Sequence, residues 1–469
     1  MRIRILLPIL LLFALAGAAV AQESKFQAEL RHEGEKLKSS CGDIKSFAGC
    51  AEVLFTGQPF HIAAGSLAPQ NGVGLGLAFV EHWNLQDKPW RLSLNADAVA
   101  SFNGSWRAGA YLKAVYVPEK KIVMRPGGTA APKPKLELTE YPVLNLYAQS
   151  ISLNKIAYFG LGQSTTVADR SYFGMTETIV GTSALLPVVG HRLNLSLYGE
   201  ANGRFIDIRA SHGQPSPSIE QVYTEATAPG LTSQPAFAQF GQGIRLRPNL
   251  SDYLRLNYLI SVQEFIAAGD SRFSFRRFTI DLNHQIPLYK TTRRPWPQDH
   301  NGPNDCSSSA TDSKHECETI KESISRNREG SIGARLFISQ SFTSSGSVVP
   351  FYFQPTLGGG DLNGHQSLQS YQDYRFRAPN VLLLQGSFEH SIRGPLGFSF
   401  IAEVGKAALT RQDLDFSHLA HSYATGLTLR AGGFPMVSLM FAWGSHEGNR
   451  TIAQMNPSLL GGSARPSLY

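Results

Sequence analysis

The sequence has few charged residues and, beyond its N-terminus, lacks long apolar runs. Charged side chains make up 17% of its 469 residues, against roughly a quarter in ordinary soluble domains. Past Gln22 no stretch approaches the roughly 18 uninterrupted apolar residues of a membrane-spanning helix, which argues against a helical inner-membrane protein. The net charge of +7 is modest for this length, so we expect no nucleic-acid partner.

The first residues predict export. Arg2 and Arg4 precede an apolar stretch at 5–15, and small residues follow at 19–21, which is the pattern of a secretory signal peptide. We therefore expect residues 1–21 to be cleaved off and the mature chain to begin at Gln22. An uncleaved N-terminal anchor is the alternative.

Cysteine is scarce, with four residues in two close pairs, Cys41 with Cys50 and Cys306 with Cys317. In an oxidising compartment, close and even-numbered pairs predict disulfides. Metal binding is the competing interpretation, but neither pair has the two-residue spacing of zinc sites. We therefore expect two disulfides, and neither a metal nor a cofactor.

The sequence is rich in glycine, with 44 residues, and contains 10% aromatic residues. Apolar and polar side chains alternate repeatedly along it. Segments of about ten residues with a period of two are typical of transmembrane barrel strands. A soluble sandwich would also alternate, but the apolar faces here carry no charge over whole strands. We count sixteen such segments, at 72–84, 90–102, 106–118, 141–153, 155–163, 171–187, 191–208, 235–247, 252–266, 271–289, 330–343, 381–393, 396–408, 418–432, 435–444 and 450–460.

An even number of strands fits a closed bacterial barrel. The predicted fold is an all-β, transmembrane antiparallel β-barrel of about 16 strands over 72–469, in the outer membrane of a Gram-negative-type bacterium. Residues 22–71 are expected to form a short periplasmic N-terminal segment. Within it, helical spacing of apolar residues at 24–38 predicts a short amphipathic helix, and a disordered linker is the alternative.

Four long connections separate the predicted strands. With both termini inside, 119–140, 209–234 and 344–380 fall on the outer side, where long loops are usual. The stretch 290–329 falls on the periplasmic side. It is therefore either an insertion there or a sign that one strand upstream has been miscounted.

The segment 351–406 carries a family resemblance. It contains Gly358 and Gly359, then Gln369 and Tyr371, then the run Tyr-Arg-Phe-Arg at 374–377, and it ends on two further strands. In order and spacing it resembles the bacterial surface antigen superfamily, the BamA/TamA-like outer-membrane barrels. The resemblance implies that 344–380 is a loop that folds into the lumen, with Arg375, Phe376 and Arg377 in its motif.

The resemblance also implies acidic partners for the inner loop. In the family an arginine of the loop reaches acidic groups on strands twelve and thirteen, which match Glu389 and Glu403, and alternation points both side chains inward. Gln369 replaces the family's arginine here, so Arg375 or Arg377 is the expected partner. Alternatively, both are ordinary lumen glutamates that meet nearby wall arginines.

The resemblance implies a role in the assembly of outer-membrane proteins or lipids, or in translocation, through a weak seam between the first and last strands. Gly72, Gly74 and Gly76 in the first predicted strand weaken pairing, and Pro457 in the last cannot donate a ladder hydrogen bond. Tight packing against the inner loop, or a bend, is the alternative. The expected partners are outer-membrane lipids and lipopolysaccharide, client outer-membrane proteins and periplasmic proteins.

The sequence departs from the family in two respects. No complete POTRA domain fits into 22–71, and the Gly-x-Ser-x-Gly motif of the lipase-fused relatives is absent.

A passive channel with a basic lumen is the alternative function. The inward positions carry more arginine and lysine than acid: Arg107, Lys113, Arg192, Arg204, Arg255, Arg277, Arg335 and Arg430 against Glu200, Asp281, Glu389 and Glu403. Catalysis is not expected, because His284, His390 and His421 lack a recognisable Ser/acid arrangement.

Overall fold

The structure is a computed structural model, and the part of the chain that it describes is all-β apart from single turns of helix. It describes residues 59–85, 88–117, 140–189, 193–248, 250, 254–293, 326–393, 396–431, 434–455 and 466–468. None of the helices in these ranges is long and apolar enough to cross a membrane. The predicted signal peptide, the 24–38 helix, Pro457 and the four cysteines lie outside the described residues, so those predictions remain predictions.

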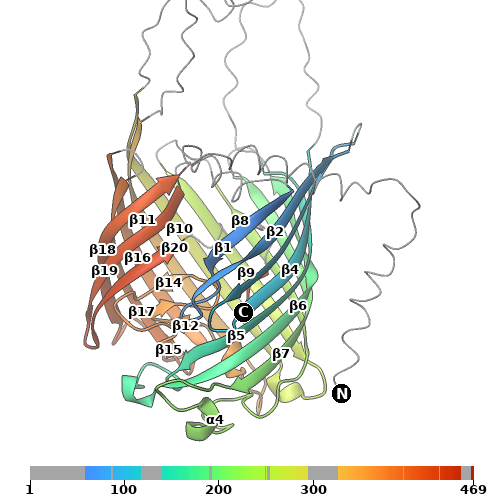
Figure 1. Cartoon of the computed structure of the whole chain (residues 1–469), viewed down its shortest axis with the longest axis vertical. Helices are drawn as coiled ribbons and strands as arrows, with labels where there is room; N and C mark the ends of the chain where they lie inside the picture. Colours follow the sequence, from blue (N-terminus) through green and yellow to red (C-terminus); the bar gives the residue numbers. More distant parts are fainter. Residues whose placement is uncertain are drawn as a thin grey trace, which may run out of the picture.

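In the described ranges, sixteen antiparallel strands form one sheet, which curls into a barrel (Figure 1). Each strand pairs with the next strand of the sheet, from β1 to β20. The strands are β1 (Phe60–Ser66), β2 (Val73–Asn84), β3 (Trp90–Ser101), β4 (Trp106–Tyr116), β5 (Val143–Tyr158), β6 (Ser171–Val189), β7 (Leu195–Ala210), β8 (Phe237–Leu246), β9 (Arg255–Ala267), β10 (Phe275–Arg293), β11 (Arg326–Phe342), β16 (Asn380–Arg393), β17 (Leu396–Ala408), β18 (Ala420–Ala431), β19 (Phe434–Ser445) and β20 (Gly448–Met455). The predicted fold class and strand number are confirmed.

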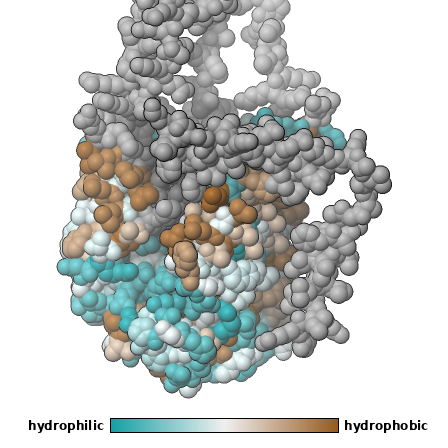
Figure 2. Space-filling model, viewed as in Figure 1, coloured by the Kyte–Doolittle hydropathy of each residue, from teal (hydrophilic) through white to brown (hydrophobic). Residues whose placement is uncertain are grey.

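Alternation sorts the side chains of each strand between the two faces of the wall. On β7, Leu197 and Phe205 are exposed on the outside, whereas Ser196 and Arg204 are completely buried inside. Figure 2 shows apolar side chains gathered on the wall and polar ones at the end that bears α4 (Ile219–Val222). An apolar outer band with a polar interior is what a barrel in lipid requires.

Two boundary errors cancel in the predicted strand count. β1 was not predicted, because its seven residues carry no alternating charge, and the sheet therefore begins before residue 72. β5 was predicted as two strands, 141–153 and 155–163. The structure has one strand there with a register shift between Leu153 and Ile156, and the polar residues at this irregularity were taken for a turn.

The added strand moves one long connection to the other end of the barrel. The connections β1–β2, β5–β6, β7–β8 and β11–β16 share one end, which we call the α4 rim. The β4–β5 connection starts and ends at the opposite rim, so the prediction that 119–140 lies with 209–234 and 344–380 is wrong. β10 ends and β11 begins at the opposite rim as well. This agrees with the side predicted for 290–329, because both count errors occur before β6.

Candidate functional site

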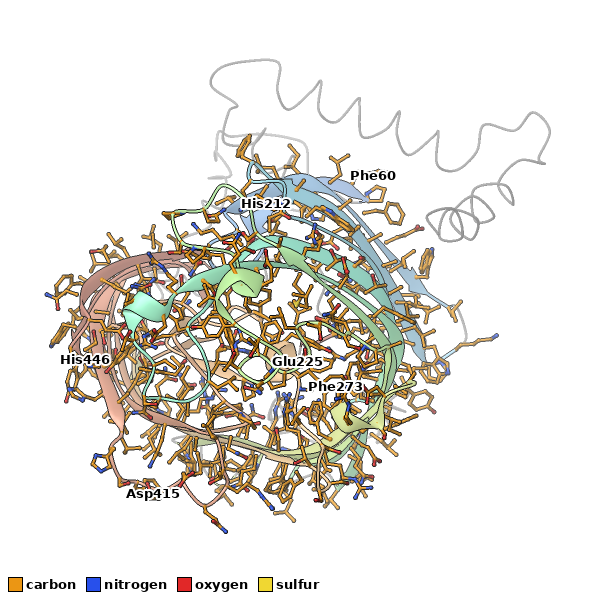
Figure 3. All side chains as sticks on the ribbon, turned by 90° about the horizontal axis from the view of Figure 1, so that it is seen from below. Phe60, His212, Glu225, Phe273, Asp415 and His446 are labelled. Carbon is orange, nitrogen blue, oxygen red and sulfur yellow. The ribbon has the colours of Figure 1, made fainter. Side chains whose placement is uncertain are left out.

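The chain between β11 and β16 folds into the barrel, and we call residues 343–379 the inner loop. Two short strand pairs shape it, β12 (Thr356–Leu357) with β15 (Phe376–Arg377) and β13 (Gly359–Gly360) with β14 (Gln366–Ser367). Seen along the barrel axis in Figure 3, side chains fill the space inside the ring of strands. The inward course is the one expected for 344–380, and the loop fills much of the lumen beside a cavity of about 460 Å³.

Three consecutive aromatic residues anchor the inner loop to the wall. Phe351, Tyr352 and Phe353 form the single turn η4 (Phe351–Phe353), and each is at most 2% exposed. Phe353 lies edge-on to Phe237 of β8, with ring centroids 4.9 Å apart. Phe351 packs in the same way on Phe173 of β6, at 5.1 Å. Burying aromatic rings contributes roughly 1.5–3 kcal/mol each, so this turn is a main attachment of the loop.

Arg375 joins the inner loop to two turns at the α4 rim. Its Nε lies 2.6 Å from Oε1 of Glu447, in the turn between β19 and β20, and both side chains are buried. Its Nη1 donates to Thr165 Oγ1 at 2.8 Å, in the β5–β6 connection, while its guanidinium lies over the rings of Phe159 and Phe376. The predicted ion pair of Arg375 with Glu389 or Glu403 is therefore wrong, because Glu447 supplies the carboxylate.

Arg377 is also buried, and it forms hydrogen bonds with backbone groups of two other segments. Its Nη1 donates to the carbonyl of Phe351 at 2.7 Å, and its own carbonyl accepts from Gly162 N at 2.7 Å. The residue therefore connects η4 with the β5–β6 connection.

Glu403 meets the inner loop through neutral donors. The backbone N–H of Gln369 donates to its Oε2 at 2.8 Å, and Gln385 Nε2 donates to its Oε1 at 2.7 Å. Glu403 is 2% exposed. The structure thus brings together the two positions that the family motif relates, Gln369 and Glu403, with a backbone amide in place of a cation.

Glu389 lies at another level of the barrel. It is half-buried on β16 and pairs in register with Ser331 and Ser399. It stands four residues beyond Gln385, which contacts Glu403, and this is about 13 Å further along the strand. Alternation predicted the inward face correctly for both glutamates, but it does not indicate how deep in the barrel each one lies.

The paired glycines of the motif allow close approach inside the inner loop. Gly358 has φ +100°, and a Cβ there would lie 2.5 Å from Cβ of Arg375. Gly359 has φ +57°, and its Cβ would lie 2.3 Å from Oδ1 of Asp373. Larger residues would strain the backbone at both positions and would displace the side chains that hold the loop.

The inner loop contacts both sides of the seam, by which we mean the space between β1 and β20. On one side, Tyr374 Oη donates to the carbonyl of Pro69, in the β1–β2 turn, at 3.1 Å. On the other, Arg450 of β20 donates to the carbonyl of Tyr371 and lies 3.2 Å from Oδ1 of Asp373. A pocket of about 660 Å³ lies between the β1–β2 turn, the inner loop and β20. Within the described strands no pairing joins β1 to β20.

The β1–β2 turn is itself tied to the wall by Asn71. This completely buried side chain donates to the carbonyl of Lys155 at 2.7 Å and accepts from Ser105 Oγ at 2.8 Å. It therefore links the β1–β2 turn to the β3–β4 turn and to the irregularity of β5.

The glycines predicted to weaken the seam lie elsewhere. Gly72 is in the β1–β2 turn, with φ +75°. Gly74 and Gly76 lie on β2, which is paired on both edges, with β1 and with β3. A Cβ at Gly76 would approach the carbonyl oxygen of Ala98 to 1.9 Å, so this glycine permits close packing of two strands. The assignment of these glycines to the seam is wrong, because an unrecognised strand precedes them.

Comparison with solved structures finds matches to BamA and CdiB at low sequence identity. A BamA structure from Haemophilus ducreyi that lacks POTRA domains 1–3 is 12% identical, has a TM-score of 0.45, and matches over 85% of this chain and 69% of that chain. CdiB from Acinetobacter baumannii is 9% identical, with a TM-score of 0.40, over 85% of this chain. CdiB from Escherichia coli is 11% identical, with a TM-score of 0.43, over 81%.

The chain spans 57% of the length of each of the two CdiB chains. No protein-family model and no curated protein sequence matches this sequence.

The lumen is closer to charge balance than the sequence analysis predicted. Arg107 lies 2.5 Å from Asp97, and Arg204 lies 2.8 Å from Glu177, with all four side chains buried. Asp97 and Glu177 were missing from the predicted inward acids, although the alternation of their strands would have found them. Arg335 pairs with Asp281 at 2.8 Å. In the described residues no three His, Cys, Asp or Glu side chains are grouped to hold a metal ion.

Proposed function

We propose that this chain is an outer-membrane barrel of the BamA/TamA-like class, and that it acts in outer-membrane protein or lipid assembly, or in translocation, through the seam between β1 and β20. One observation carries the proposal. The inner loop bonds the β1–β2 turn through Tyr374 and bonds β20 through Arg450. A loop that bonds both edges can hold them at a fixed separation and can release them, which is what lateral opening requires.

The outer wall supports the membrane part of the proposal. Leu75 and Leu77 of β2 and Leu439 and Phe441 of β19 are exposed on either side of the seam. Apolar side chains on this face fit contact with lipid acyl chains. The proposed partners are therefore outer-membrane lipids and lipopolysaccharide, together with client outer-membrane proteins or periplasmic proteins that reach the seam.

A disulfide across the seam tests the proposal. Cysteine at Ala64 of β1 is combined in turn with cysteine at Thr451 or Ala453 of β20, since these positions alternate with the inward-facing Ala63 and Arg450. In cells that depend on the protein, the pair that oxidises should stop growth and lower the yield of folded outer-membrane proteins, and reductant should restore both. Normal growth with a fully formed crosslink would sink the proposal.

The matched control is a crosslink between strands that are already paired. Ala64 and Leu75 are register partners on β1 and β2, so a disulfide between them adds the same chemistry without closing the seam. Growth and assembly should stay normal in this variant.

A passive pore, for which the sequence predicted a basic lumen, is the second candidate, because a cavity of about 460 Å³ lies in the lumen. Arg277 and Arg335 line it together with Glu200, Asp281 and Asp361. Planar-bilayer recording of the purified full chain separates the two candidates. Large, steady, anion-selective openings would favour the pore. Low conductance at rest is expected if the inner loop fills the lumen.

A further inference from the structure

Residues Pro466–Leu468, which follow β20 in the chain, lie inside the lumen against a distant wall. β7 is the seventh strand of the sheet and β20 the sixteenth, yet Arg204 of β7 donates from Nη2 to the carbonyl of Ser467 at 2.8 Å. Leu468 is 6% exposed and belongs to the hydrophobic cluster of the inner loop and the wall.

A single peptide group of this segment is held from both sides. The carbonyl of Ser467 accepts from Arg204, and the N–H of the same peptide bond, at Leu468, donates to Oδ1 of Asn363 at 2.7 Å. Asn363 lies in the inner loop, so the peptide bond joins the loop to the β7 wall. Recognition of a backbone group by hydrogen bonds, with a pocket for one side chain, is how extended peptides are bound.

The wall side of this contact is rigid. Arg204 is completely buried, lies 2.8 Å from Glu177, and donates from Nε to Gln239 Oε1 at 2.5 Å. Its guanidinium also lies over the rings of Phe265 and Phe353. These contacts fix the donor that faces Ser467, so the site is organised by the wall and the loop.

We propose that the lumen contains a peptide-binding site, formed by Arg204, Asn363 and the apolar pocket around Leu468, and that the chain's own residues 466–468 fill it as an intramolecular latch. The ligand class is an extended peptide with an aliphatic side chain next to the recognised peptide bond. Pro466 and Ser467 also line the lumen cavity of about 460 Å³. The bound segment therefore narrows the lumen and fixes the inner loop to the wall. This inference is independent of the proposed seam.

The experiment uses the full chain with Leu468→Asp, which places a charge in the apolar pocket. Leu409→Asp is the matched control, because Leu409 is 53% exposed in the β17–β18 connection. The probe is a fluorescent peptide, Arg-Pro-Ser-Leu-Tyr, with the sequence of residues 465–469. It should bind Leu468→Asp at least ~10-fold more tightly than the parent chain or Leu409→Asp, where the tethered segment occupies the site at high effective concentration.

Bilayer conductance is the second measurement. Leu468→Asp should conduct more than the parent, and the peptide should lower its conductance again, whereas a peptide with Asp in place of Leu should not. Leu468→Ala gives the same test without a buried charge and serves if Leu468→Asp does not fold, because it leaves Arg204 and Asn363 in place. It should raise conductance and bind the peptide more tightly than the parent chain does. Unchanged conductance and no peptide binding in the folded variants would overturn the inference, as would a rise in conductance without peptide binding.

Discussion

The backbone amide of Gln369 and the carboxylate of Glu403 are joined by a 2.8 Å hydrogen bond. Glu403 also accepts a hydrogen bond from the side-chain amide of Gln385, and no salt bridge to Glu403 is found in the described part of the chain. A buried carboxylate is therefore held between neutral donors, at the point where the inner loop meets β17. This arrangement makes the shape of the acceptor more important than its charge.

Glu403→Gln should therefore cost less stability than Glu403→Ala. The glutamine oxygen can still accept from Gln369, and the amide of Gln385 can turn to accept in exchange. We expect a loss of about 1 kcal/mol or less for Glu403→Gln and of ~1–3 kcal/mol for Glu403→Ala, which leaves the amide of Gln369 without its acceptor. Urea unfolding in lipid vesicles, followed by tryptophan fluorescence, measures both. Equal losses would contradict this prediction.

Arg375→Met should strongly destabilise the inner loop. It leaves the Glu447 carboxylate buried without its cation, and breaking a buried pair in this way costs ~3–5 kcal/mol. The double variant Arg375→Met/Glu447→Gln removes the stranded charge and should recover part of the loss. Unfolding of the parent, the single and the double variants measures the effect. A double variant that is less stable than the single one would show that the unpaired Glu447 carboxylate is not the cause of the loss.

Phe353→Ala should remove the main aromatic anchor of the loop. Phe353 is 1% exposed and contacts the rings of Phe237, Phe265 and Phe275. Truncating a buried phenylalanine costs ~3–5 kcal/mol. Phe416→Ala is the control, because Phe416 is 69% exposed and its truncation should change the unfolding free energy little. Comparable losses in the two variants would show that burial is not the cause.

Gly359→Ala should cost more stability than Gly346→Ala. Both glycines have positive φ, +57° and +78°, so both variants strain the backbone, by ~1–2 kcal/mol. A Cβ at Gly346 meets open space, whereas one at Gly359 collides with Asp373. The difference between the two unfolding free energies therefore isolates the steric contribution. Equal losses of unfolding free energy would show that Asp373 moves aside without destabilising the loop.

His365 should make a small, pH-dependent contribution to stability. The hydrogen bond with Asp361, at 3.2 Å, raises the pKa of His365 above 6.5. Because the pKa of His365 is higher in the folded protein, protonated His365 stabilises the fold below pH 6.5. This stabilisation is lost as the pH rises through the raised pKa. The side chain is 65% exposed, so the contribution is about 1 kcal/mol or less.

Unfolding of the parent and of His365→Gln between about pH 5.5 and pH 8.5 checks this contribution. The stability advantage of the parent should shrink as the pH rises. An advantage that grows with pH would reverse the assignment.

The architecture was predictable because alternation is a local property. The inward positions of Arg204, Arg277 and Glu403 follow from the neighbours of each residue in the sequence, and the structure buries all three. β1 was not predictable in this way, since Phe60–Ser66 lacks polar alternation and becomes a strand only by pairing with β2.

The partners of the inner loop were not predictable from local patterns. Arg375 meets Glu447, 72 residues away, and Tyr374 meets Pro69, 305 residues away. Such contacts depend on how far the loop descends into the lumen and on the curvature of the sheet. A motif could therefore identify Arg375 as important without identifying the carboxylate that it binds.

The aromatic turn at 351–353 also bears on the order in which the barrel is built. Its ring partners, Tyr158, Phe173, Phe237, Phe265 and Phe275, all precede it in the chain. Strands β5 to β10 therefore offer a complete docking surface before β16 to β20 are needed. The turn can therefore pack on a sheet that is still open, and the last five strands can then be added around it. The inner loop in this way acts as a template for closing the wall and need not be inserted into a finished barrel.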